Sequence, residues 1–297
     1  YRLAATATPS PNDYMELGNH SEFAGVLSYT DMLSSFFTHD GSETQKWRLK
    51  GHAESRFWEW VSKWALMFNS PEHLGFDGSK YVLPELNYEY HTVDIDYGNA
   101  GDGMLFPLQA VTMSERLKAR RDSVQSRCEY AAELLSKDSK AHVVWCNLND
   151  ESKLIKELTD CVEITGSDKD EKKEEILVAF SEGQINRLVT KPSICGFGMN
   201  WQHCHNTTFV GLNDSYEQVY QAVKRFHRFG QKNDVTANFI IAENEGNVAA
   251  NIRRKELQAN NMLNNMIGYM KNVSRNVEAS QRLGSGYNAT HNINLPQ

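Results

Sequence analysis

The alternation of apolar and polar positions becomes regular from about residue 112 onward. Short apolar runs predict strands, and the periodic stretches between them predict helices. The expected strands are 141–146, 161–164, 187–190, 207–212 and 235–242, and the expected helices are 113–137, 151–158, 169–181 and 216–229. Strands that are separated by helices of this length are typical of a parallel sheet with helices on both faces. The pattern therefore predicts an α/β fold for this part of the chain.

The preceding stretch, residues 36–110, is rich in aromatic residues and follows a different pattern. Apolar positions recur there with the spacing of an amphipathic helix: Phe57, Trp60, Val61, Trp64, Ala65 and Phe68. This spacing favours core packing over base stacking. Upstream, Lys46, Arg48 and Lys50 alternate with apolar residues, as on a half-buried strand with one basic face. That face is either a solvated strand edge or a contact for a nucleic-acid backbone.

Composition narrows the class of protein. The 297 residues include 31 Lys and Arg against 38 Asp and Glu, so the net charge of −7 excludes a uniformly basic coat but not a local basic groove. No apolar run is long enough to span a bilayer. The five cysteines include no Cys-x-x-Cys pair, which favours reduced thiols and a cytoplasmic protein without a membrane partner. His203, Cys204 and His205 are adjacent and point in different directions, so we predict no metal site.

The most specific motif is the segment from Gln221 to Gln231, QAVKRFHRFGQ. It ends a predicted helix that Ser215 and Gln218 begin as a capping box. Because Arg225 and Arg228 are three positions apart, both guanidinium groups are expected on one face of that helix. Two such planar groups suit a polyphosphate. The alternative is a solvated basic helix end that complements the helix dipole.

This string resembles the sixth motif of the Swi/Snf family of superfamily-two helicase-like ATPases, with wording closest to phage and bacterial members. Thr6-Ala7-Thr8-Pro9 is similar to the third motif, His142 to Cys146 to the fourth, and Gly196-Phe197-Gly198-Met199-Asn200 to the core of the fifth. Order and spacing agree over roughly residues 1–35 and 105–245. The fifth motif departs at Ser193, where the family usually has a basic residue; Lys191 stands two positions earlier.

The resemblance implies a domain organisation. Residues 1–35 would be the end of a first RecA-like lobe, and 36–110 an aromatic-rich α-helical insertion with a linker. Residues 111–245 would be the second RecA-like lobe, a parallel sheet with helices on both faces. Residues 246–297 would form a C-terminal helix and a loose tail.

The resemblance also implies roles for individual residues. ATP with Mg²⁺ would bind between two lobes, and Arg225 and Arg228 would act as arginine fingers that Gln221 and Gln231 position. Gly196, Gly198 and Asn200 would approach the nucleotide. Thr6 and Thr8 would couple the nucleotide state to lobe closure. DNA is expected to be duplex and to bind through its phosphate backbone. The expected contacts are Lys191 and Ser193, in the segment similar to the fifth motif, and Lys46 and Arg48, on the basic strand described above.

Two motifs that ATP hydrolysis requires are missing. None of the 19 glycines is followed by lysine, and no Asp-Glu-x-His sequence is present. In the family both lie in the first lobe, so that lobe would supply the phosphate-loop lysine and the magnesium ligands. The chain alone is therefore expected not to hydrolyse ATP. Two alternatives remain open: a non-catalytic DNA-binding clamp or adaptor, and a translocase that serves an attached nuclease or methyltransferase.

Overall fold

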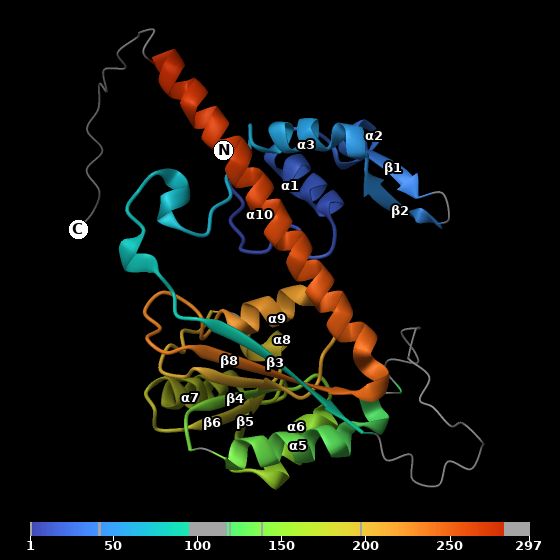
Figure 1. Ribbon diagram of the computed structural model, residues 1–297. Helices are drawn as coiled ribbons and strands as arrows, with labels where there is room; N and C mark the ends of the chain where they lie inside the picture. The colour runs from blue at the N-terminus through green and yellow to red at the C-terminus, as the bar shows by residue number, and fades with distance from the viewer. Residues whose placement is uncertain are drawn as a thin grey trace. The chain divides into compact units, whose positions relative to one another are not determined.

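The computed structural model describes residues 2–40, 43–94, 118, 120–137, 139–196 and 198–281 (Figure 1). The chain forms two compact units. The aromatic unit comprises Tyr1–Ser10, Tyr14–Asp77 and Ala259–Gln297, and the sheet unit comprises Pro11–Asp13 and Gly78–Gln258.

The sheet unit is built on six parallel strands in the order β3-β8-β7-β4-β6-β5. Their bounds are β3 (Leu86–Val93), β4 (His142–Trp145), β5 (Val162–Glu163), β6 (Arg187–Thr190), β7 (Asn206–Phe209) and β8 (Val235–Ala242). Parallel strands must be joined by crossover connections, and helices form these connections here. The predicted α/β class with a RecA-like parallel sheet is confirmed.

Helices cover both faces of this sheet. They are α5 (Val124–Ser136), α6 (Asn149–Leu158), α7 (Asp170–Ser181), α8 (Pro192–Cys195), α9 (Tyr216–Val223) and the first part of α10 (Gly246–Gln281), with 3-10 turns at Ser79–Tyr81 and Glu243–Glu245. Figure 1 shows α5 and α6 on one side of the sheet and α8 and α9 on the other.

Successive residues of a strand point to opposite faces of the sheet, and each face has its own hydrophobic core. Val144 and Val189 pack with Cys128 of α5 and Ile155 of α6. On the opposite face, the ring of Trp145 lies 6.1 Å from Trp201, 6.2 Å from Phe209 and 6.3 Å from Phe226, measured between centroids. Because both faces are covered, the interior strands β4 and β8 are largely apolar and buried.

β3 corrects the predicted organisation. It lies within 36–110, which the sequence assigned to an α-helical insertion, yet all eight of its residues pair with β8. Its partner lies some 149 positions away along the chain, as in the pair Leu86 and Val235, so no local pattern reveals the pairing. The linker residues 95–110, the start of the predicted helix at 113–117, and the tail 282–297 lie outside the described residues.

The aromatic unit has its own core. It contains α1 (Leu17–Ala24), α2 (Tyr29–Phe36), an antiparallel hairpin of β1 (Phe37–Asp40) and β2 (Glu43–Leu49), α3 (Glu54–Val61) and the second part of α10, with 3-10 turns at Tyr14–Glu16, Gly51–Ala53 and Pro71–Leu74. Phe57 and Trp58 are buried there with three methionines of α10 at four-residue spacing, Met262, Met266 and Met270. None of the helices in the described part of the chain is long and apolar enough to cross a membrane.

The aromatic helix is shorter than its apolar pattern predicts. α3 ends at Val61, and Phe68 is 50% exposed. The Ser62 hydroxyl donates to the carbonyl of Glu59 at 2.8 Å, and the next amide, that of Lys63, turns to the carbonyl of Trp60. The helical hydrogen-bond ladder is thereby broken. The Trp60 and Trp64 rings still pack against the core.

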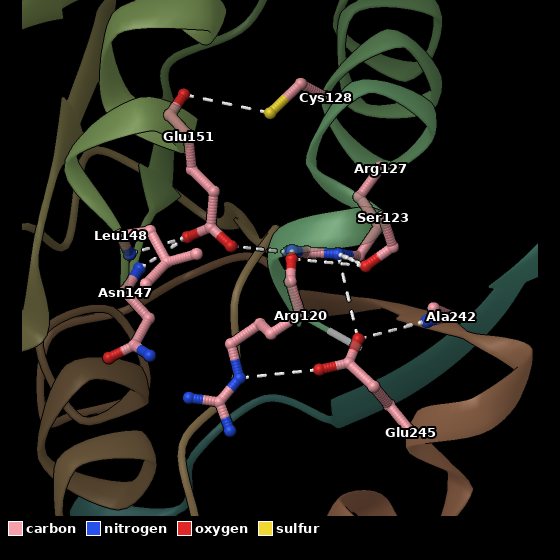
Figure 2. A network of polar contacts seen from close by, with 9 residues as sticks. All are labelled: Arg120, Ser123, Arg127, Cys128, Asn147, Leu148, Glu151, Ala242 and Glu245. Atoms are coloured by element: carbon pink, nitrogen blue, oxygen red, sulfur yellow. Dashed lines mark hydrogen bonds and ion pairs between the residues drawn. The ribbon is translucent and has the colours of Figure 1, made fainter. Parts of the chain in front are cut away.

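A buried ionic network joins α5, α6 and the end of β8 (Figure 2). Its members are Arg120, Arg127, Glu151 and Glu245. Arg127 Nη1 lies 2.7 Å from Glu151 Oε1, and both side chains are fully buried. Glu245 bridges Arg127 Nε at 3.7 Å and Arg120 Nε at 3.4 Å. Burial raises the pKa of Glu245, and Arg127 opposes that shift.

The network also fixes the start of α6 and the turn after β7. Glu151 Oε2 accepts hydrogen bonds from the backbone N–H groups of Asn147 at 2.7 Å and Leu148 at 2.9 Å, which lie at the amino end of α6. A Cβ on Gly211 would collide with the same carboxylate. The turn after β7 therefore requires glycine as long as Glu151 is held there.

Candidate functional site

Two segments meet where β7 and β8 begin. The loop 196–205 leads into β7 at Asn206, and the turn 224–234 leads into β8 at Val235. Since β7 and β8 are parallel neighbours, the two segments lie at the same edge of the sheet. The backbone N–H of Trp201 donates to the carbonyl of Arg225 at 3.0 Å, and this hydrogen bond joins the two segments.

Arg225 is held at this junction by acceptors from both segments. Its Nε donates to the carbonyl of Gln221 at 3.0 Å, Nη1 to the carbonyl of Met199 at 3.0 Å, and Nη2 to Gln221 Oε1 at 3.4 Å. A guanidinium group carries five N–H donors. These bonds use three of them, so each Nη atom keeps one donor for another partner.

Arg228 approaches the same loop. Its side chain is half-buried, and Nη1 donates to Asn200 Oδ1. We call Gly198, Met199, Asn200, Gln221, Arg225 and Arg228 the arginine site. Within the described part of the chain, no carboxylate forms an ion pair with either arginine.

The arginine site therefore has an uncompensated positive charge. Arg225 is only 9% exposed, and burial lowers its pKa, with the charge of Arg228 as the second cause. A buried charge without a counter-charge is costly, because the protein interior screens and solvates ions poorly. An anion bound between the two guanidinium groups would remove that cost.

The position of the arginines differs from the prediction. α9 ends at Val223, not at Phe229, so Arg225 and Arg228 lie in turns and do not share a helical face. Three carbonyls at the end of α9 have partners outside a helical ladder: that of Gln221 bonds Arg225 Nε, that of Arg225 bonds the backbone N–H of Trp201, and that of Phe226 bonds Gln231 Nε2. The arginines converge because both contact one loop.

The predicted cap of α9 is present in part. Ser215 Oγ accepts from the N–H of Gln218 at 3.3 Å. The Gln218 side chain does not reach back to the cap residue; its Oε1 accepts from Asn213 Nδ2 at 2.7 Å. The capping box is thus replaced by a single cap and a side-chain bond to the loop after β7.

Gln231 stabilises the turn 224–234 through hydrogen bonds of its side-chain amide. Its Nε2 donates to the carbonyls of Cys204 at 3.1 Å and Phe226 at 3.3 Å, and its Oε1 accepts from the N–H groups of Lys232 and Asn233, each at 2.9 Å. All four hydrogen-bonding positions of the amide are occupied. This arrangement favours a positioning role over direct contact with a ligand, whereas Gln221 contacts Arg225 itself.

The two glycines of the loop have different surroundings. Gly196 is buried, and a Cβ there would collide with the carbonyl oxygen of Pro192, so the tight turn itself requires this glycine. Gly198 is exposed at φ +82°, with open space where a Cβ would lie. Asn200 is also exposed. Asn200 therefore contacts Arg228, Gly198 precedes Met199 in the same loop, and Gly196 shapes the loop.

Two of the remaining predicted DNA-contact residues belong to the sheet unit, and the two predicted coupling residues belong to the aromatic unit. Lys191 follows β6, and Ser193 is exposed on α8; no hydrogen bond or ion pair of the described residues joins them to the arginine site. Thr6 and Thr8 belong to the aromatic unit, where Thr8 N–H donates to Thr6 Oγ1 at 3.1 Å. Their proposed roles stay predictions.

Arg48 and Lys46 also belong to the aromatic unit, on β2. Arg48 is exposed. The side chain of Lys46 lies outside the described part of the structure. The predicted basic strand is thus present, and a contact with DNA stays a prediction.

The histidine and cysteine cluster at 203–205 makes internal contacts. Cys204 Sγ donates to the carbonyl of Ala141 at 3.1 Å, and the His203 ring packs 4.9 Å from Phe180. All five cysteines are unpaired and buried. Among the described residues, no three or more His, Cys, Asp or Glu side chains gather closely enough to hold a metal ion.

Sequence reasoning missed His227, which anchors the turn. The ring lies between Pro84 O and Lys224 Nζ, each 2.9 Å from a ring nitrogen. A carbonyl only accepts and an ammonium only donates, so Nε2 carries the proton and Nδ1 accepts. Burial lowers the pKa of His227, and Lys224 adds to the shift against the opposing bond to Pro84.

This geometry predicts a pH dependence of stability. As pH falls through about 6.5, the unfolded chain takes up a proton at His227 before the folded chain does, so the free energy of unfolding should decrease. His227→Gln keeps a donor and an acceptor but does not titrate, and should lose less stability between pH 7 and pH 5. Urea unfolding at several pH values measures this. Equal losses in both proteins would contradict the prediction.

Part of the chain is similar to a known domain. Residues 126–230 match the model of the helicase conserved C-terminal domain. No curated protein matches the chain. Among solved structures, the C-terminal part of the Fun30 ATPase domain aligns with a TM-score of 0.39 and 12% identity, covering 52% of this chain and 57% of that one. A DEAD box protein from Methanococcus jannaschii aligns with a TM-score of 0.40 and 18% identity, covering 58% and 39%.

The RNA helicase Prp28 from Chaetomium thermophilum, bound to ADP, aligns with a TM-score of 0.40 and 14% identity, covering 60% of this chain and 38% of that one. The chain thus spans between 38% and 57% of the length of these three structures. Arg225, Arg228 and the loop that they contact all lie inside residues 126–230, the stretch that matches the helicase conserved C-terminal domain.

Proposed function

We propose that this chain is the C-terminal portion of a DNA-dependent ATPase, a Swi/Snf-type helicase or duplex translocase of the phage or bacterial kind. The match of residues 126–230 to a helicase domain supports the class of enzyme. The observation that carries the proposal is Arg225, a buried arginine beside a second arginine, with no carboxylate partner in the described part of the chain.

The residues of the arginine site fit the outer phosphate of ATP. The two remaining donors of Arg225 and the guanidinium of Arg228 can bind phosphate oxygens in the forked geometry that arginine favours. Gln221 and the carbonyl of Met199 fix Arg225, and Asn200 orients Arg228. Gly198 leaves its backbone open to the nucleotide. The γ-phosphoryl group of ATP carries negative charge while it is transferred. Arginines that are already in place stabilise this charge without reorganisation.

The roles of the other parts of the proposed ATPase follow from the resemblance and belong to the proposal. A first RecA-like lobe would hold the phosphate-loop lysine and the Mg²⁺ ligands. Thr6 and Thr8 would couple the nucleotide state to lobe closure, and Lys191 and Ser193 would contact the DNA backbone. The free cysteines favour a cytoplasmic setting, in a bacterium or a phage-infected cell.

The test is ATP hydrolysis by the polypeptide that joins this chain to a first lobe with a lysine-bearing phosphate loop. Turnover is measured with and without duplex DNA at one stated salt concentration, since phosphate contacts depend on salt. We expect DNA to accelerate hydrolysis, and the 297-residue chain alone to be inactive. DNA binding by the joined polypeptide without any hydrolysis would instead support the clamp or adaptor.

A further inference from the structure

A hollow of about 350 Å³ lies at the base of the β1–β2 hairpin of the aromatic unit. Its lining residues come from both strands and the turn that follows: Thr38, Arg48, Leu49, Lys50, Gly51 and His52. We call it the hairpin hollow. It belongs to the aromatic unit, and the arginine site belongs to the sheet unit.

The strand register explains why polar groups gather there. Phe37 pairs with Leu49, and Thr38 pairs with Arg48. Successive residues of a strand face opposite sides. Because Phe37 is buried in the core, Thr38 and Arg48 share the outer face. Lys50 is fixed just beyond the strand, where its Nζ donates to the carbonyl of Ser34 at 3.0 Å, at the end of α2.

The charge of the hollow is uncompensated. Its lining includes the cations of Arg48 and Lys50, the ring of His52 and the hydroxyl of Thr38, and it includes no carboxylate. Arg48 is exposed and forms no ion pair with any carboxylate that the structure describes. Lys63 of the same unit, by contrast, is exposed and paired with Glu59 at 3.1 Å.

We infer that the hairpin hollow binds a phosphate of a nucleic-acid backbone, with Arg48 as the principal contact. An arginine fork binds phosphate oxygens in pairs, and a neighbouring hydroxyl is a common phosphate contact. The inference rests on the proposed function only in its choice of duplex DNA as the partner.

The experiment measures binding of a fluorescently labelled DNA duplex to the 297-residue chain without nucleotide, over a range of salt concentrations. Arg48→Ala should weaken binding roughly tenfold at low salt and make the slope of log K against log salt shallower by about 1. Lys63→Ala, which removes a paired and exposed cation of the same unit, is the matched control and should change neither quantity.

Further variants distinguish an effect of the Arg48 charge on DNA binding from an effect on folding. Arg48→Lys keeps the charge and should keep the salt slope, and Arg48→Gln should behave as the alanine variant does. Because Arg48 is exposed, the thermal midpoint should not change in any of them. If the unaltered chain does not bind the duplex at low salt, or if Arg48→Ala binds as tightly as Lys63→Ala, the inference fails. Either result leaves the ATPase proposal standing, since no ATP is involved.

Discussion

Replacing Arg225 by alanine in the proposed intact ATPase should lower DNA-stimulated turnover by about 10³–10⁵-fold, the range that an arginine finger contributes. The physical reason is that Arg225 is held by Gln221 and Met199 and keeps two donors free. Duplex binding should change little, since the arginine site is proposed to bind the nucleotide and not the DNA. Steady-state ATP hydrolysis and duplex binding, measured on the same preparation, check both statements.

Three variants sharpen this test. Arg225→Lys keeps the charge but loses the fork, so it should remain strongly impaired. Arg228→Ala removes a half-buried side chain and should show a loss of similar size. Arg254→Ala removes an exposed arginine of α10 that donates to Gln258 Oε1, and should leave turnover unchanged. Normal turnover in Arg225→Ala would remove the arginine finger from the proposal.

Glu151→Gln should lower the free energy of unfolding by about 3–5 kcal/mol, the cost of breaking a buried ion pair at one partner. The change leaves Arg127 fully buried, with only the more distant Glu245 as a counter-charge. It also weakens the acceptor for the Asn147 and Leu148 N–H groups at the start of α6. Equilibrium unfolding in urea measures the loss.

The matched control for this change is Glu133→Gln. Glu133 forms an ion pair with Lys137 on α5, and both side chains are about two-thirds exposed, at 66% and 65%. Exposed pairs contribute less than about 1 kcal/mol, so the control should be nearly neutral. Arg127→Met should cost about as much as Glu151→Gln. Similar small effects at Glu151 and Glu133 would show that the buried network contributes little to stability.

Local patterns were sufficient for most of the fold. The strands 187–190 and 235–242 were predicted with their observed bounds, because a strand covered on both faces is rich in apolar residues over a short stretch. The strand β3 was not predicted in this way. Half-buried and exposed positions largely alternate along this edge strand, where only Val93 is buried, and its pairing with β8 depends on residues far along the chain.

For the site, the sequence identified the arginines but not how they are held. Their spacing in a helical pattern predicted one face of a helix. The helix ends earlier because tertiary partners, Trp201 N–H and the Gln231 amide, occupy the carbonyls that it would need. The buried ionic network was missed for a related reason. Its partners, Arg127, Glu151 and Glu245, come from three separate elements, and no spacing in the sequence relates them.

The pairing of β3 with β8 has a practical consequence for making this domain. Nearly all of β8 is apolar and buried, and β3 is what closes that side of the sheet. A recombinant fragment cut to begin after residue 93 would present β8 as an open, hydrophobic edge, which invites strand pairing between molecules and precipitation. Soluble expression therefore requires residues 86–93, which lie upstream of the stretch that sequence similarity alone delimits.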